Sequence, residues 1–347
     1  MESSRDSCVF TARDADRVGF QNIDRQLGTA ELYAGGPLDA AVIEEALRLG
    51  FEQLALGEIY VRNGEAAGRI YEDAGFRRHD GCPGGLSLHA SEWRARRGLG
   101  PRVVLMQPHF LPWLGYLELI DRADVFVFLD DFQFSRQSWS QRNRLFAGPG
   151  SVGMVTLPIR HEHNPEATFL DIREANPAWR RKLRNLLTCN YQRARYGAAV
   201  LALVDEWLAE PYANVGDLEI ALIEKISAYL GLGARFVRSS TLGIDRLRRS
   251  ARLVAILKTL GAGTYVSAHG SFPYMKEDGV FPLANLPVYF QDHAPREYAQ
   301  HGSGEFVPRL SCLDALANLA PSEVRVTLRG TEWWQSWEER AASEIAA

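Results

Sequence analysis

Residues 103–145 read VVLMQPHFLPWLGYLELIDRADVFVFLDDFQFSRQSWSQRNRL. Residues 103–106 form a short apolar run, and Pro108 closes it because proline has no N–H to donate to a sheet ladder. Residues 125–129 form a second apolar run, too short for a helix and rich in β-forming side chains. Between the two runs, the leucines and isoleucine of residues 114–120 predict a short buried helix. We therefore expect two neighbouring strands of a buried parallel sheet.

Polar side chains follow both predicted strands. Gln107 and His109 come after the first strand, and Asp130, Asp131 and Gln133 come after the second. Ligand sites in parallel α/β sheets lie at the carboxyl ends of the strands, so these side chains are the first candidates for a site. Successive side chains of a strand point to opposite faces, so only one of the two aspartates is expected to face a ligand. The alternative for this pair is a cap of the turn beyond the strand.

The same stretch resembles the opening of the WbqC-like proteins, through MQPHFLPWLGY, ADVFVFLDDFQFSRQSW and QRNR. Further pieces follow in the family's order, and the similarity covers residues 102–320. These pieces are TLPI at 156–159, RSSTL at 238–242, RLVAILKTLGAGTYVSAHG at 252–270 and FVPRLSCLDAL at 306–316. The resemblance implies transfer of an acyl or aminoacyl group to an amine on an activated, nucleotide-linked amino sugar or a similar small molecule. It places the protein in polysaccharide (O-antigen) or natural-product biosynthesis.

Strands and helices alternate through this part of the chain. The predicted strands are 152–157, 234–237, 264–267 and 288–290, and the predicted helices are 178–187, 197–210, 217–230, 248–260 and 312–318. This order predicts an α/β fold with a mostly parallel, Rossmann-like sheet and helices on both faces. Residues 94–101 combine charge, glycine and proline, which is typical of a linker. We expect a small module at 1–98, the α/β domain at 99–335 and a C-terminal tail at 336–347.

The stretches ELYAGGPLDAAVIEEALRLGFEQLALGEIYVRNGEAAGRIYEDAGFRRHD at 31–80 and GGLSLHASEWRAR at 84–96 resemble the second half of a GNAT-type N-acetyltransferase. This resemblance implies a small truncated α/β module. The resemblance implies that Gly35 and Gly36 present backbone N–H groups to the pyrophosphate of acetyl-CoA. Too few residues precede this turn to build the acceptor half of such an enzyme. We therefore expect an accessory module, with Tyr71 in its core, that docks on its neighbour or on another subunit of a homo-oligomer.

Amide formation needs a neutral amine, a group that takes its proton, and donors aimed at the oxyanion. The catalytic candidates are His109, Asp130, Asp131 and His269. The substrate-binding candidates are Gln107, Trp113, Tyr116, Gln133, Trp139, Asn143, Arg144 and Ser267.

Several of these candidates have a plainer alternative. Trp139, Asn143 and Arg144 stand at roughly helical spacing and predict a clamp for a sugar, base or phosphate. Pairing of the arginine with a carboxylate that fixes the loop is the alternative. Trp113 and Tyr116 fit a core equally well, and His269 fits an exposed loop. His161 and His163 lack a third ligand, so no metal site is predicted.

Composition narrows the classes of partner. The net charge is −4 and the pI is near 6.1, which argues against nucleic acid. The four cysteines are far apart and show no C-x-x-C spacing, which is typical of a reducing cytoplasm. No apolar run approaches the ~20 residues of a membrane span. No cofactor is certain. An acyl-CoA or the thioester of an acyl or peptidyl carrier protein is the expected donor.

Two other functions stay open. Trp113, Gly115 and Tyr116 stand where HIGH-motif nucleotidyltransferases bind ATP phosphates, and Gly115 would let a phosphate approach the backbone. This similarity implies an ATP-dependent amide ligase. The third hypothesis is a non-catalytic scaffold that recruits a carrier protein.

Overall fold

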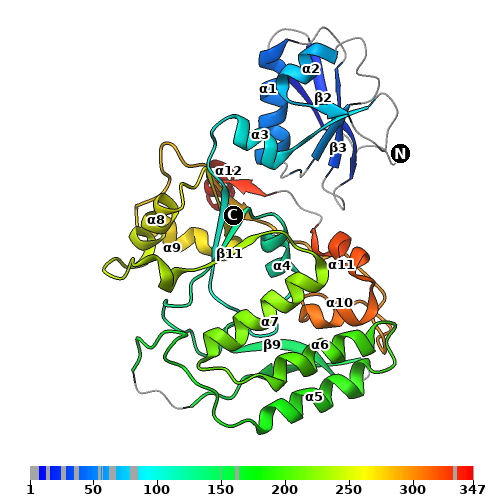
Figure 1. Ribbon diagram of the computed structural model, residues 1–347, viewed down its shortest axis with the longest axis vertical. Coiled ribbons are helices and arrows are strands. Elements are labelled where there is room, and N and C mark those ends of the chain that lie inside the picture. Colours follow the sequence, from blue (N-terminus) through cyan, green and yellow to red (C-terminus); the bar gives the residue numbers. More distant parts are fainter. Residues whose placement is uncertain are drawn as a thin grey trace.

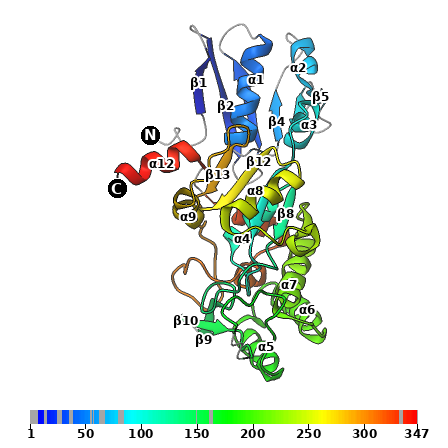
Figure 2. The same ribbon diagram turned by 90° about the vertical axis from the view of Figure 1, so that its left-hand side faces the viewer.

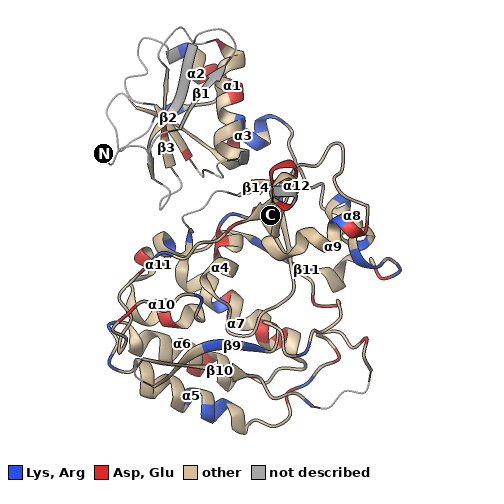
Figure 3. Ribbon diagram, turned by 180° about the vertical axis from the view of Figure 1, so that it is seen from behind, with Lys and Arg blue, Asp and Glu red and all other residues tan. Residues whose placement is uncertain are grey.

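The computed structural model describes residues 8–12, 16–24, 29–34, 39–53, 56, 58–61, 68–78, 85–148, 150–160, 164–330 and 334–346. The chain forms two α/β units, the first running from β1 to α3 and the second from β7 to α12 (Figure 1). Acidic and basic residues are interspersed over both units, in keeping with the small net charge (Figure 3). Within the described residues, no helix combines the length and the apolar character needed to cross a membrane.

The first unit is a six-stranded sheet in the order β1-β2-β3-β4-β6-β5. β3 and β4 pair in parallel, and the other neighbouring strands pair antiparallel. Its elements are β1 (Cys8–Ala12), β2 (Asp16–Asp24), β3 (Thr29–Ala34), α1 (Ala40–Arg48), η1 (Leu49–Gln53), β4 (Glu58–Val61), α2 (Gly68–Ala74), β5 (Arg77–Arg78), β6 (Leu86–His89) and α3 (Ala90–Arg96). The unit buries its own core around Phe20, Phe51 and Trp93, and Tyr71 lies in this core against Phe76. The strands β1 to β3 were not predicted from the sequence.

Two buried arginines join the units. The Arg102 guanidinium donates to the Phe51 carbonyl at 2.6 Å, and the Arg94 guanidinium donates to the Gly100 carbonyl at 2.8 Å and to Thr264 Oγ1 at 3.0 Å. Arg102 and Thr264 are the first residues of β7 and β12. The first unit therefore docks at the amino-terminal edge of the second sheet, beyond β12 in Figure 2.

The second unit contains the predicted Rossmann-like sheet. Its strand order is β11-β8-β7-β12-β13-β14, with parallel pairing throughout except for β14 at the edge. The strands are β7 (Arg102–Met106), β8 (Val125–Phe128), β11 (Arg235–Arg238), β12 (Thr264–Ala268), β13 (Val288–Gln291) and β14 (Gln335–Ser336). The chain passes from β7 to β8 and β11 on one side, then returns to β12 and β13 on the other. The topological switch point therefore lies between β7 and β12, where such sheets bind ligands.

Helices cover both faces of this sheet, as predicted. Val104 and Phe126 point to the face covered by α4 (Leu114–Asp121), α7 (Val215–Leu230), α10 (Cys312–Asn318) and α11 (Pro321–Leu328). Val103 and Val125 point to the face covered by α8 (Arg249–Thr259), α9 (Phe272–Glu277) and α12 (Trp337–Ala346). Trp337 packs against Phe290 of β13 at 5.8 Å between ring centroids, so residues 336–346 are part of the second unit's core packing.

A helical extension with one hairpin continues the second unit beyond the sheet. It contains β9 (Arg142–Gly148), β10 (Ser151–Thr156), α5 (Ala178–Tyr191) and α6 (Gly197–Ala209). β9 pairs antiparallel with β10, so the helical spacing expected for Trp139, Asn143 and Arg144 is wrong. Gly150, with a φ of 66°, supplies the left-handed turn that allows this hairpin to form.

Candidate functional site

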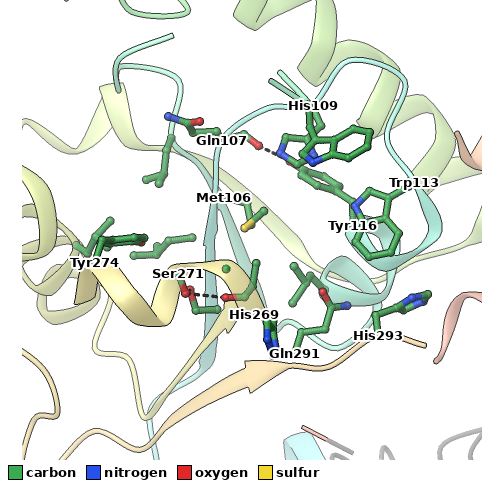
Figure 4. Close-up of a pocket in the computed structure, with 18 of the residues that line it drawn as sticks. Met106, Gln107, His109, Trp113, Tyr116, His269, Ser271, Tyr274, Gln291 and His293 are labelled. Atoms are coloured by element: carbon green, nitrogen blue, oxygen red, sulfur yellow. Dashed lines mark hydrogen bonds between the residues drawn. The ribbon is translucent and has the colours of Figure 1, made fainter. Parts of the chain in front are cut away.

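A cavity of about 820 Å³ lies at the carboxyl ends of β7, β12 and β13, beside the switch point. Figure 4 shows His109, Trp113 and Tyr116 on one side of it and Tyr274 on the opposite side. The sequence candidates that line this cavity are Gln107, His109, Trp113, Tyr116, Trp139, Ser267 and His269. The structure thus gathers side chains that follow β7 with side chains that follow β12.

His109 presents a neutral imidazole to the cavity. Its ring lies on the Tyr116 ring with 4.8 Å between centroids, and burial lowers the pKa of His109 to about 4. Its buried Nδ1 makes no hydrogen bond with any of the described residues. At pH 7 the ring is therefore uncharged.

Tyr116 and Gln107 hold the loop that carries His109. The Tyr116 hydroxyl donates to the Gln107 carbonyl at 3.1 Å, and the Gln107 carboxamide donates to the Gln133 carbonyl at 3.0 Å. Burial raises the pKa of the Tyr116 hydroxyl well above its ordinary value, so this group stays protonated and acts as a donor. The two contacts orient the loop between β7 and α4 before any ligand binds.

The wall after β12 contains a hydroxyl pair and a second imidazole. Ser267 is buried and shares hydrogen bonds with Tyr265 Oη at 3.0 Å and Ser271 Oγ at 2.7 Å. Ser267 is therefore occupied by protein partners although it borders the cavity. His269 lies in the exposed turn η4 (His269–Ser271), where its ring is accessible to a ligand.

The end of β13 contributes cavity residues that the sequence analysis missed. Gln291 donates to the Gly115 carbonyl and to Glu118 Oε2, both at 2.7 Å. His293 meets the Trp113 ring edge-on at 4.9 Å, and Asp292 lies between these two residues. Residues 288–290 were predicted as a strand, so applying the strand-end rule to them would have found this wall.

The remaining walls come from elements distant in sequence. Arg249 begins α8, Tyr274 lies in α9, and Arg309 precedes α10. No local pattern marks these residues, because the helices that carry them reach the cavity only through packing on opposite faces of the sheet.

A family model described as the WbqC-like protein family matches residues 107–326. This chain belongs to that family. The uncharacterized protein Rv1507c of Mycobacterium tuberculosis is 28% identical over 236 residues, which is 65% of this chain and 97% of that protein. Among solved structures, mutant forms of the spermidine/spermine N-acetyltransferase SpeG from Vibrio cholerae match with a TM-score of 0.23 and 20% identity, covering 26% of this chain and 69% of theirs. A TM-score this low supports no statement about fold or activity.

In this WbqC-like protein, Asp130 and Asp131 do not reach the cavity, contrary to our expectation. Asp130 is fully buried and accepts hydrogen bonds from Ser240 N at 3.0 Å and Ser240 Oγ at 2.8 Å. Asp131 forms an ion pair with Arg252. Asp130 is held away from the cavity because β11 lies beside β8 in the sheet. The turn after β11 supplies the N–H and hydroxyl donors that bind its carboxylate. Both carboxylates therefore anchor protein segments, which is the alternative that the sequence left open.

Asn143, Arg144 and Gln133 also lie outside the cavity and support its walls. The buried Asn143 carboxamide donates to the Leu111 carbonyl at 2.6 Å, which holds Leu111 at a φ of 50° in the loop between β7 and α4. Arg144 donates to the Pro308 carbonyl at 3.3 Å. Gln133 donates to the Pro165 carbonyl at 2.7 Å.

Gly115 is not open to a phosphate. A Cβ atom placed on it would lie 2.4 Å from the Trp113 indole, which therefore covers the start of α4. This geometry gives no support to the ATP-dependent ligase.

The described cavity lining includes none of the remaining glycines, histidines and cysteine that the sequence brought to attention. Gly35, Gly36, His161 and His163 lie outside the described residues. Cys312, the first residue of α10, is packed in the core, and burial raises the pKa of its thiol, so no reactive thiolate is available there. Within the described ranges, no group of three or more His, Cys, Asp or Glu side chains is arranged to hold a metal ion.

Glu219 of α7 offers a test of the packing behind Tyr116. It is buried, and neither carboxyl oxygen finds a hydrogen-bond partner among the described residues. Replacing Glu219 with Met should raise the free energy of unfolding at pH 7 by about 1–3 kcal/mol, because an unsatisfied buried carboxyl is removed. Glu206→Met, on the exposed face of α6, should change it by less than about 0.5 kcal/mol. Urea titration measures both variants.

The gain from Glu219→Met should depend on pH. Burial raises the pKa of Glu219 in the folded state well above its ordinary value of 4.5. As the pH rises past that ordinary value, the unfolded chain releases the proton first, so Glu219 increasingly destabilises the wild type. The gain should therefore be larger at pH 7 than at pH 4. An equal gain at both values would contradict a buried, neutral Glu219.

Proposed function

We propose that this protein is an N-acyl or aminoacyl transferase. It forms an amide on the amine of an amino sugar, or of a similar small molecule, in polysaccharide or natural-product biosynthesis. The donor is an acyl-CoA or the thioester of a carrier protein. Membership of the WbqC-like family supports the class of reaction, and the cavity beside the switch point supports a small-molecule substrate.

One observation carries the proposal, which is the neutral imidazole of His109 on the cavity wall. The amine nitrogen attacks the thioester carbonyl and forms the C–N bond. His109 accepts the proton that the amine loses, the C–S bond breaks, and the departing thiolate takes a proton. His269 is the second imidazole within the cavity lining and is suited to donate to the oxyanion.

The rest of the cavity lining suits a sugar bearing an amine. Trp113 and Trp139 offer aromatic faces, and Asp292 offers a carboxylate that attracts an amine. Trp139 is 45% exposed, so its indole ring is accessible to a ligand.

The test is an amide-forming assay with the full chain. Acyl-CoA and aminoacyl-carrier thioesters are paired with amino sugars, free and nucleotide-linked, and products are detected by mass spectrometry. We expect one donor and acceptor pair to give an amide and one equivalent of free thiol. Folded protein that yields neither product with any pair would refute the transferase and leave the scaffold hypothesis.

A further inference from the structure

The cavity lining contains one arginine that no carboxylate neutralises. Arg249 pairs with Asp278 at 2.8 Å and with Glu277 at 3.3 Å, so its charge is balanced within the protein. Arg309 lines the same cavity and is exposed. Its guanidinium makes no hydrogen bond or ion pair with any residue in the part of the chain that the structure describes. Its five donors are therefore available to a ligand.

The backbone at Arg309 is strained and held in place. Its φ is 60°, a left-handed value that side chains with a Cβ atom disfavour. Arg144 of β9 fixes the turn from both sides, because it donates to the Pro308 carbonyl at 3.3 Å and its own carbonyl accepts from Ser311 N at 2.9 Å. Backbone strain that neighbours enforce in this way is concentrated at functional sites.

Arg144 therefore has a role different from the clamp that its sequence position predicted. It does not line the cavity, but it sets the turn that presents Arg309 to it. Gln300 adds a third restraint, since its side-chain oxygen accepts from Val307 N at 2.7 Å. The backbone that carries Arg309 is held in place before a ligand arrives, which lowers the entropic cost of ordering this turn on binding.

We propose that Arg309 binds a phosphoryl group of the substrate. The planar guanidinium matches phosphate oxygens in a two-pronged arrangement. The exposed aromatic rings of Trp139 and Tyr274, which line the same cavity, are available to stack a nucleobase. This inference rests on the proposed transferase, in which two substrates carry a diphosphate: a nucleotide-linked amino sugar and a CoA thioester. The same site chemistry serves either one.

Titration calorimetry with the full chain tests the site without turnover. The probes are inorganic pyrophosphate, UDP and CoA. Arg309→Ala should weaken binding of the preferred probe by about 10- to 100-fold, the equivalent of one charge-assisted contact. Arg309→Lys keeps the charge but loses the planar fork, so its loss should be smaller. Arg181→Ala is the matched control, because Arg181 is an exposed arginine of α5 outside the cavity, and it should bind like the wild type.

The probes separate the two sources of phosphate. If UDP binds more tightly than CoA, and Arg309→Ala loses affinity for UDP only, the site binds the acceptor substrate. If CoA binds more tightly, and the variant loses affinity for CoA only, the site binds the donor. Wild-type protein that binds none of the probes, or Arg309→Ala that binds all of them unchanged, would overturn the proposal. Circular dichroism of each variant checks that the fold is retained, and Arg309→Gly gives a second variant in which the left-handed backbone is relaxed.

These measurements also separate this proposal from the proposed function. If UDP or CoA binding depends on Arg309 while no amide forms, the phosphate site stands and the transferase fails. If amide forms and its KM values do not change in Arg309→Ala, the transferase stands and the phosphate site fails.

Discussion

Replacing His109 with Gln should lower kcat/KM for amide formation by about 10²–10⁴-fold, the usual contribution of a positioned general base. Glutamine preserves polarity at the cavity wall but cannot take a proton from the attacking amine. His301→Gln is the matched control, because His301 is exposed and lies outside the cavity lining. Initial rates of thiol release measure both variants.

The pH dependence of wild-type kcat/KM gives a sharper signature. Burial lowers the pKa of His109 to about 4, so the folded protein keeps this ring neutral down to that value. Kcat/KM should be insensitive to His109 ionisation near neutrality and should fall as the pH drops through about 4. Activity in His109→Gln should lack this acid limb. An unchanged rate and profile in the variant would remove His109 from the mechanism.

The same shift predicts how His109 affects stability. The unfolded chain binds a proton at the ordinary histidine value of 6.5, whereas the folded chain does so only near 4. Between these two values the unfolded state holds more protons, so stability falls as the pH drops through this window. His109→Gln should lose less stability between pH 7 and pH 5 than the wild type does in urea titrations.

Asp130→Ala should lower the free energy of unfolding by about 3 kcal/mol while kcat stays close to the wild-type value. The buried carboxylate accepts from Ser239 Oγ at 3.3 Å as well as from Ser240. Its removal leaves these buried donors without a hydrogen-bond acceptor. Asp130→Asn keeps one acceptor oxygen and should lose roughly half as much. Urea midpoints and initial rates are the two readouts.

The alternative outcome for Asp130 is equally clear. A carboxylate that takes part in catalysis would show the reverse pattern, with kcat greatly reduced and the urea midpoint nearly unchanged. That result would restore the role that its position after a strand first indicated, and would require the turn after β11 to open during the reaction.

The elements of the second unit were largely predictable because their signals are local. Residues 103–106 and 125–129 are apolar runs of strand length, and they form β7 and β8. Residues 312–318 match α10 without a change of boundary, and Ser311 caps this helix by accepting from Leu313 N. The hairpin of β9 was missed because pairing with residues 151–156 overrides the spacing of three side chains.

Membership of the candidate site was less predictable because it depends on partners far along the chain. Asp130 and His109 both follow strands of the same sheet, yet only His109 borders the cavity. The difference lies in Ser239 and Ser240, more than a hundred residues away, which occupy the Asp130 carboxylate. No local pattern reveals whether a polar side chain will meet protein or solvent.

The amino-acid order alone determined the alternation of strands and helices, which depends on neighbours within a few positions, and the family, which short motifs spread along the chain reveal. Only the tertiary structure decided which polar groups share the cavity and that Arg309 borders it with a guanidinium that none of the described residues neutralises. The physical reason is that burial of apolar faces brings distant elements together, and hydrogen bonds and ion pairs then form between them. No single stretch of the sequence determines which of these polar groups will pair.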